Sequence, residues 1–171
     1  MILPAVRDPR LVSIRRGGTL SETDHRLLAL WAATCAEHVL ILFEDSNSGD
    51  TRPRDAIEAA RAWARGQARM MDTRAIGGHA MEAARPLRGA ARFAAYSAGQ
   101  AACVAHVPEH DLGAAAYAIK AVRAAAPRGK EKEAGKVERD WQRRQLPASL
   151  HDLVLEDQAR RNDICWGVFG D

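Results

Sequence analysis

The stretch RPRDAIEAARAWARG, at residues 52–66, decides the fold predicted for this chain. Its apolar residues recur at the spacing of one helix face: Ala56, Ile57, Ala60, Trp63 and Ala64. The charged residues of the stretch fall on the opposite side, which is the pattern of an amphipathic helix. We therefore predict a helix here, with Ile57 and Trp63 pointing into an apolar core.

Residues at both ends of this stretch favour a helix of this length. Thr51 suits the N-cap position, and Pro53 fits the first turn, where a missing N–H costs nothing. Asp55 lies near the positive end of the helix dipole, and Gly66 can adopt the conformation that closes a helix. Both ends of the helix are thus predicted locally.

The rest of the chain is also predicted to be helical. Alanine is the most frequent residue and aromatic residues make up only 5%, so the summed propensity favours helix. We predict an all-α, single-domain bundle of about six to seven helices, with further helices near residues 21–43, 72–84, 86–103, 111–126, 137–144 and 149–162. Four large side chains should pin its alanine-lined core: Trp31, Trp63, Trp141 and Trp166.

Three of these helices carry more specific expectations. The helix at 21–43 should be central and capped by Ser21. The helix at 72–84, capped by Asp72, contains Gly77 and Gly78, which should cost about 1 kcal/mol each relative to alanine. The helix at 137–144 follows a charged, mobile connector at 128–133. It should lie on the surface and turn Val137 and Trp141 inward.

The two ends of the chain are predicted to lie on this bundle. Residues 1–20 contain a β-like piece at 11–14 and are expected to form a short extended arm, with residues 21–171 as a single helical domain. The tail at 164–169 is too apolar to remain in water, so it should fold back and close the core.

The composition indicates a cytoplasmic protein without membrane association. The net charge of +3 falls short of the concentrated positive field that nucleic-acid binders usually carry. Cys35, Cys103 and Cys165 are odd in number and far apart, which is typical of reduced, buried thiols. The amino terminus does not have a signal-peptide pattern, and the longest uncharged run, at 93–108, is short for a bilayer.

No catalytic, metal-binding or cofactor-binding residues are predicted. His106 and His110 are four residues apart, but Pro108 between them breaks the helix that would align them. His38 and His79 lie on apolar helix faces, where core histidines are commoner than ligands. The sequence has no nucleophile elbow and no phosphate loop. A small metal- or histidine-dependent enzyme using His79, His106 or His110 is the alternative to a binding protein.

Charged residues around the predicted helix at 52–66 are the candidates for binding a partner. Arginine forks there could pair with carboxylates of another protein or buttress the preceding loop. Acidic residues are interleaved with the basic clusters of the chain, so a nucleic-acid-associated accessory protein is only a second alternative. The candidate partner-binding residues are Glu44, Asp45, Asp50, Arg52, Arg54 and Arg61.

The stretch DTRPRDAIEAARAWARG at residues 50–66 resembles the signature of a family of immunity proteins from bacterial polymorphic toxin systems, the immunity-five-like helical group. Other segments are similar to the family as well: DHRLLALWAA at 24–33, AHVPEHDLGAAAYAIKA at 105–121, WQRRQLP at 141–147 and DQARRNDICW at 157–166. The similarity spans nearly the whole chain. One departure is Gly77–Gly78, where the family has alanine-like helix formers.

The resemblance implies an all-α, cytoplasmic, non-enzymatic protein that binds and neutralises a cognate toxin. It would act by occlusion, with affinity concentrated in a few aromatic and arginine residues. Inhibitors of nucleases often present an acidic face to a basic toxin. The weakly basic charge therefore argues against a nuclease target, unless Glu44, Asp45 and Asp50 gather on one face.

Overall fold

Residues 52–64 form a helix, as predicted. In the computed structural model, which describes residues 3–170, this helix is α3 (Arg52–Ala64). Ile57 is 2% exposed, and Gly66 follows the helix with a φ of 75°, a left-handed value that favours glycine. Trp63 is half-buried, and its ring meets the buried His25 ring edge-on at 4.8 Å between centroids. Ile57 therefore points fully into the core and Trp63 in part.

The rest of the described chain confirms the all-α prediction. The other α-helices are α1 (Glu22–His38), α2 (Ile41–Glu44), α4 (Met70–Ala84), α5 (Gly89–Cys103), α6 (Asp111–Ala125), α7 (Glu131–Arg144) and α8 (His151–Arg161). Between residues 3 and 170 this makes eight α-helices, one of them the four-residue α2. The helix predicted at 21–43 is divided between α1 and α2. None of the helices in this part of the chain is long and apolar enough to cross a bilayer.

The arm at residues 3–20 is less extended than predicted. It winds through two 3-10 turns, η1 (Pro9–Leu11) and η2 (Ile14–Arg16), and the described chain has only one β-bridge, between Ser13 and Leu20. Pro9 favours the first turn because its φ is already helical, and the Asp8 carboxylate caps that turn. Leu11 and Leu20 are buried, so the arm does lie on the helices.

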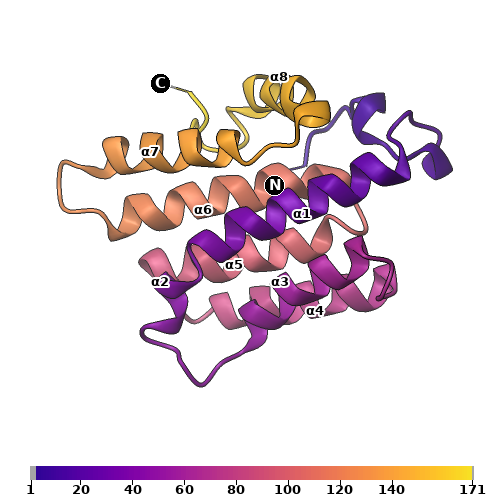
Figure 1. Ribbon diagram of the computed structural model, residues 1–171. Helices are drawn as coiled ribbons and strands as arrows, with labels where there is room; N and C mark the ends of the chain where they lie inside the picture. The colour runs from indigo at the N-terminus through magenta and orange to yellow at the C-terminus, as the bar shows by residue number, and fades with distance from the viewer. Residues whose placement is uncertain (1–2, 171) are drawn as a thin grey trace.

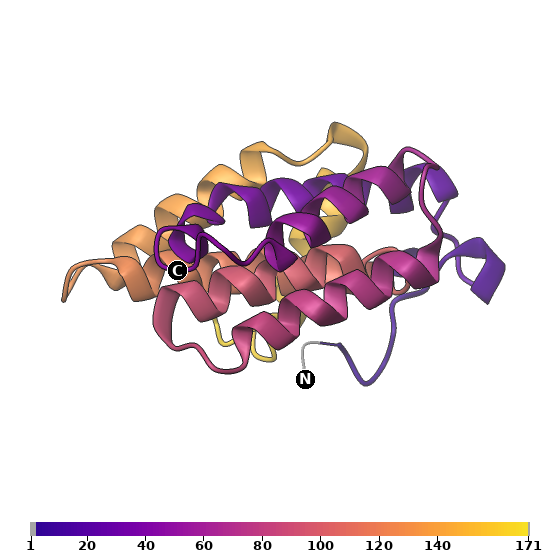
Figure 2. The same cartoon turned by 90° about the horizontal axis from the view of Figure 1, so that it is seen from below.

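The central helix is α5 rather than the predicted one at 21–43. It packs against α1, α2, α3, α4 and α6, and Figure 1 shows α7 and α8 on the far side of α6 from α3 and α4. From Ala94 to Cys103 every residue except Tyr96 is buried. Small side chains along α5 let five helices approach it closely. Figure 2 shows the α6–α7 loop at one end of the bundle and the arm at the other.

A close crossing between α4 and α5 explains one of the two glycines inside α4. A Cβ added at Gly77 would lie 2.7 Å from the carbonyl oxygen of Gly99, and one at Gly99 would lie 2.8 Å from that of Gly77. Backbones this close leave no room for a methyl group. At Gly78 the same Cβ would have no atom within 4 Å. The third predicted helix is nevertheless unbroken through both glycines.

One of three predicted N-caps is confirmed. The Ser21 hydroxyl accepts the backbone N–H of Asp24 at 3.0 Å. Thr51 makes no such bond, because the Asp50 carboxylate accepts the first free N–H of α3 instead. Asp72 lies inside the first turn of α4, which begins at Met70, two residues before the predicted start.

The face that α7 turns inward is polar, contrary to the prediction. Val137 is 63% exposed, whereas Glu138 and Gln142 are buried. The Gln142 amide donates to the carbonyl of Ala115 on α6 at 3.1 Å and to Glu138 Oε1 at 2.9 Å. A polar side chain can face inward when bonds of this kind replace those to water. The helix also begins at Glu131, so part of the predicted connector at 128–133 is helical.

The four tryptophans do not all pin the core. Trp31 is buried and donates its indole N–H to the carbonyl of Gln142 at 2.9 Å. Trp63 and Trp141 are half-buried, and Trp166 is 45% exposed. The tail does fold back as predicted, because Cys165, Val168 and Phe169 are buried. Ile164 and Trp166, which belong to the same tail, are exposed and, contrary to the prediction, do not contribute to the core.

A buried arginine joins α8 to the start of α6. The Arg161 side chain is 1% exposed and donates to Asp157 Oδ2 at 2.6 Å and to Asp111 Oδ1 at 3.2 Å. It also donates to the carbonyl of Glu109 at 2.9 Å. The Glu109 carboxylate in turn accepts two bonds from Arg7, at 2.7 and 2.5 Å, which hold the arm. Burial raises the pKa of Asp111 to about 7, and the neighbouring guanidinium opposes that shift.

Candidate functional site

The six residues predicted to bind a partner lie around the α2–α3 loop, where most of them pair within the chain. Arg54 donates two hydrogen bonds to Glu44, at 2.8 and 2.6 Å, and Arg52 donates to both oxygens of Asp50. Arg61 pairs in the same way with a glutamate of α1. The hydrogen bonds from Arg52 hold the pKa of Asp50 below its usual value. Arg52 and Arg54 therefore buttress the loop, whereas Arg61 joins α3 to α1, and the carboxylates of Glu44 and Asp50 do not form a bare acidic face.

The histidines of the alternative enzyme do not converge on one site. His79 is exposed on α4. His110 lies at the end of η3 (Pro108–His110), where its Nδ1 is 2.7 Å from Gln100 Oε1, and burial lowers its pKa to about 4. His106 Nδ1 is 3.4 Å from the guanidinium of Arg16. Among residues 3–170, no group of three His, Cys, Asp or Glu side chains is arranged to hold a metal ion.

His38 is exposed rather than part of the core. Its ring stacks on Trp141 with the centroids 3.6 Å apart, and its Nδ1 lies 2.8 Å from the buried carboxylate of Glu138. The contact joins α1 to α7. No nucleophilic side chain is bonded to this histidine in the described chain, so the pair has a structural role here.

The basic clusters considered for nucleic acid do not form a continuous stripe. Arg161 is buried, and Arg143 donates to Gln158 Oε1 at 2.9 Å and to the carbonyl of Phe169 at 3.0 Å. Both arginines are thus committed to contacts inside the chain. Their neighbours Arg160 and Arg144 are exposed.

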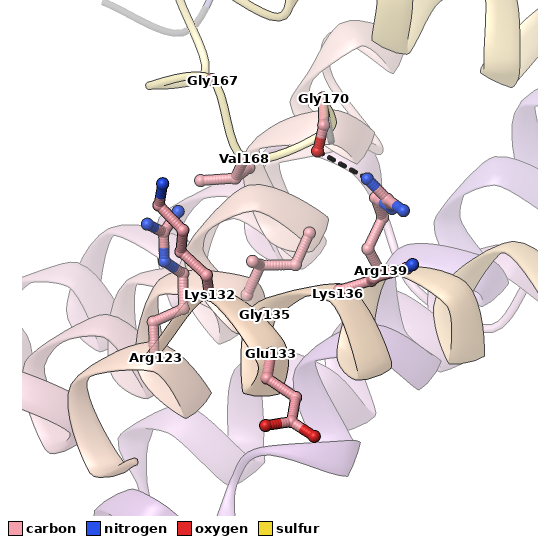
Figure 3. A pocket seen from close by; sticks show the side chains of 10 residues that line it. Arg123, Lys132, Glu133, Gly135, Lys136, Arg139, Gly167, Val168 and Gly170 are labelled. Atoms are coloured by element: carbon pink, nitrogen blue, oxygen red, sulfur yellow. Dashed lines mark hydrogen bonds between the residues drawn. The ribbon is translucent and has the colours of Figure 1, made fainter. Parts of the chain in front are cut away.

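A pocket with a basic lining lies between α6, α7 and the tail, and we call it the basic pocket (Figure 3). It encloses about 420 Å³, and its cations are Arg123, Lys132, Lys136 and Arg139. In Figure 3 the side chains of Arg123 and Lys132 point toward the same end of the pocket, whereas Glu133 points away. Glu133 instead accepts a hydrogen bond from Lys130 at 2.9 Å.

Gly135 sets the position of Arg123 in this pocket. A Cβ on Gly135 would lie 2.8 Å from Cγ and Cδ of Arg123. The missing side chain therefore lets the aliphatic stem of the arginine lie directly on α7, while its guanidinium reaches the pocket. This is a second place where a helical glycine is explained by a close approach.

Next to the basic pocket lies a group of ring side chains that we call the aromatic cluster: Phe93, Tyr96, Tyr117 and Trp166. Tyr117 is at its centre, 5.1 Å from Tyr96 and 5.0 Å from Trp166 between centroids. Lys120 places its ammonium 3.7 Å from the Trp166 ring centre and 4.6 Å from that of Phe93. Burial and two nearby guanidiniums lower the pKa of this lysine. A depression of about 410 Å³ beside Trp166 shares Arg123 with the basic pocket.

Hydrogen bonds to the tail backbone hold Trp166 in place. Asn162 Oδ1 accepts the N–H groups of Phe169 and Gly170 at 3.0 and 3.1 Å. Arg139 donates to the Gly170 carbonyl at 2.5 Å, as the dashed line in Figure 3 marks. The φ of Trp166 is 59°, a conformation that is uncommon outside glycine and that surrounding contacts must maintain.

Sequence reasoning missed both features because their residues come from separate elements. The aromatic cluster combines α5 and α6 with the tail, so rings as distant in the sequence as Tyr96, Tyr117 and Trp166 come together only in the folded chain. One signal was present: Gly167 after Trp166 favours a turn, which would leave the preceding side chain outside the core.

The fold and these features define the class of the protein. It is an all-α protein that presents aromatic and basic side chains on the surface of a helical bundle. Residues 18–149 match the family described as Imm-5 like putative immunity protein. The chain belongs to this family, as the resemblance indicated. The match covers every helix from α1 to α7, whereas α8 and the tail that carries Trp166 lie outside it. No curated protein and no solved structure matches the chain.

Proposed function

We propose that this protein is an immunity protein that binds a cognate toxin of a bacterial polymorphic toxin system and neutralises it without catalysis. The observation that carries the proposal is membership of the immunity family over residues 18–149. The toxin would be met in the cytoplasm of the producing cell, where reduced thiols such as the three free cysteines persist.

The structure supports occlusion as the mode of action. A body of tightly packed helices can cover the active site of an enzyme without changing shape, which keeps the entropic cost of binding low. Tryptophan, tyrosine and arginine are the residues that most often dominate binding energy, and the aromatic cluster presents such side chains at the surface.

The charged residues around the α2–α3 loop stay in this proposal as a second, polar contact surface. The side chains of Arg52 and Arg54 are nearly half exposed and those of Glu44, Asp50 and Arg61 about a quarter, so a partner could reach part of each without unfolding the loop. Exposed ion pairs contribute about 0.2 to 1 kcal/mol each. We therefore assign Glu44, Asp45, Asp50, Arg52, Arg54 and Arg61 to the rim of an interface rather than to its centre.

The test is co-expression with the toxin-like product of the adjacent gene. We expect restored growth and co-purification of the two proteins, and an unrelated toxin as control should be neither neutralised nor retained. A titration of the toxin's activity then separates binding from catalysis. Inhibition by occlusion is complete at about one immunity protein per toxin, whereas an enzyme would inactivate many toxin molecules each. Inhibition at far lower ratios would therefore support the histidine-dependent alternative.

A further inference from the structure

Three cations of the basic pocket make no hydrogen bond or ion pair with a carboxylate within residues 3–170, although one of them, Arg123, lies near enough to Glu131 to add to the backbone hydrogen bonds that lower the pKa of that carboxyl. The three cations are Arg123, Lys132 and Lys136. Elsewhere on the surface, arginines such as Arg54 and Arg61 form bidentate ion pairs with glutamates. Arg123 and Lys132 point toward one end of this concave site, whereas Lys136 points the other way (Figure 3). The fields of the three cations add within the pocket and attract an anionic group.

The rim of the pocket supplies the apolar part of an interface. Trp166 is 45% exposed, although Cys165 before it and Phe169 after it are hydrogen-bonded to the bundle. Its ring belongs to the aromatic cluster and also lines the depression that shares Arg123 with the pocket. An exposed indole fixed in one orientation loses little conformational entropy when a partner covers it.

We propose that the basic pocket receives an acidic segment of the toxin, with Trp166 as the neighbouring apolar contact. This inference rests on the proposed function and names the surface and the partner's charge. Carboxylate side chains of the toxin would pair with Arg123, Lys132 and Lys136, and an apolar residue beside them would cover the indole. The pocket is thus positively charged, whereas inhibitors of basic nucleases often bind them through an acidic face.

The surroundings of the pocket favour a short acidic segment of a protein over a nucleic acid. The cavity of about 420 Å³ has room for a few side chains only. Glu131 lines the adjoining depression, and Glu133 lines the pocket itself. Glu131 interrupts the positive charge beside the pocket, and Glu133 points away from it and pairs with Lys130. The cations therefore do not form the uninterrupted track that a continuous phosphate backbone needs.

Three triple variants test the proposal. Binding to the adjacent gene's product is measured by calorimetry, and neutralisation is measured by rescue of growth. The first is R123E/K132E/K136E, which inverts the charge of the pocket. The matched control is R65E/R74E/R144E, which makes the same change in net charge at three exposed arginines that have no carboxylate partner in the described chain and do not line the pocket. R123Q/K132Q/K136Q removes the charge without inverting it, in case the first variant does not fold.

We expect the pocket variants to weaken toxin binding by about 30-fold or more and the control by less than about threefold. Trp166→Ala should also weaken binding by about 30-fold. Equal loss in the pocket and control variants would overturn the inference, while rescue by the wild type would still support the proposed function. A wild type that neither rescues nor binds rejects both. A different result would reassign the pocket to nucleic acid. In that case the pocket variants would bind the toxin as the wild type does, and they would lose a salt-sensitive binding of RNA or DNA that the wild type shows.

Discussion

The ammonium nitrogen of Lys120 lies 3.7 Å from the centre of the Trp166 ring. This contact joins α6 to the tail at a residue with a positive φ. A cation over an indole is stabilising, and it helps to keep the ring in an orientation that the backbone alone would disfavour. The tail is therefore held by a side-chain contact as well as by its backbone hydrogen bonds.

Replacing Trp166 by alanine or by glycine distinguishes the contribution of the ring to stability from that of the backbone strain. Both changes remove the contacts with Lys120 and Tyr117, but only glycine adopts a φ of 59° without cost. We expect Trp166→Gly to be more stable than Trp166→Ala by about 1 kcal/mol in urea unfolding. Equal midpoints for the two variants would mean that this φ is not maintained in solution.

Arg161 and Arg160 are adjacent but should differ greatly in their effect on stability. Arg161→Ala leaves the buried carboxylates of Asp157 and Asp111 without their shared cation, which should cost about 3 to 5 kcal/mol. Arg160→Ala removes a partly exposed ion pair with Asp157 and should cost below about 1 kcal/mol. Denaturant unfolding of both variants is the measurement. Similar losses would show that the Arg161 network is open to water.

Replacing each of the two neighbouring glycines of α4 by alanine should change the stability of the protein in opposite directions. Gly77→Ala forces a methyl group against the Gly99 backbone and should cost about 1 to 3 kcal/mol. Gly78→Ala meets no atom and improves the helix propensity, so it should stabilise the protein by up to about 1 kcal/mol. Thermal melts monitored by circular dichroism distinguish these outcomes. A stabilising Gly77→Ala would contradict the close crossing of α4 and α5.

Trp31 and Trp63 were both predicted to lie in the core, but replacing them by alanine should lower the stability by unequal amounts. Trp31→Ala empties a buried site and removes the bond to the Gln142 carbonyl, which should cost about 3 to 5 kcal/mol. Trp63 is half-buried, so Trp63→Ala should cost less, about 1 to 3 kcal/mol. Urea unfolding compares the two. A larger loss at Trp63 would indicate that α3 is more deeply packed than the structure shows.

His110 should make stability depend on pH in a defined direction. Its pKa of about 4 lies below the usual 6.5, so the unfolded chain binds a proton that the folded chain excludes. The stability from this group is complete above about pH 6.5 and is lost as the pH falls toward 4.

His110→Gln, which cannot take the proton, tests this dependence. Relative to the wild type, the variant should gain about 3 kcal/mol as the pH falls from 7 to 4. The difference between the two proteins is the quantity to measure, since Asp111, whose pKa is raised, acts in the opposite direction in the wild type. A constant difference between pH 7 and pH 4 would show that His110 is protonated normally in the folded chain.

The helix pattern could be predicted from the sequence because its signals are local. Ser21 and Gly66 mark helix ends through their own backbone bonds and conformations, and both were placed correctly. The cost assigned to Gly77 was also a local estimate, but the structure offsets it with a close approach to Gly99. Propensity alone could not reveal that approach, since it depends on the neighbouring helix.

The inner face of α7 and the candidate surface could not be predicted in this way. An apolar stripe was expected to face inward, but Gln142 faces inward because Ala115 of another helix supplies an acceptor. Similarly, Trp166 and Lys120 meet only after the tail has folded back. Tertiary contacts of this kind have no periodic signal along the chain.

The bonds that fasten the tail all engage its backbone. Asn162 accepts from N–H groups, and Arg139 and Arg143 donate to carbonyl oxygens. None of these bonds involves the side chain at position 164 or 166, and both of those side chains are exposed. The hydrogen bonds of the tail therefore tolerate other side chains at these two positions, so that the displayed residues could change to suit a different toxin at the cost of the contacts of Trp166 with Lys120 and Tyr117.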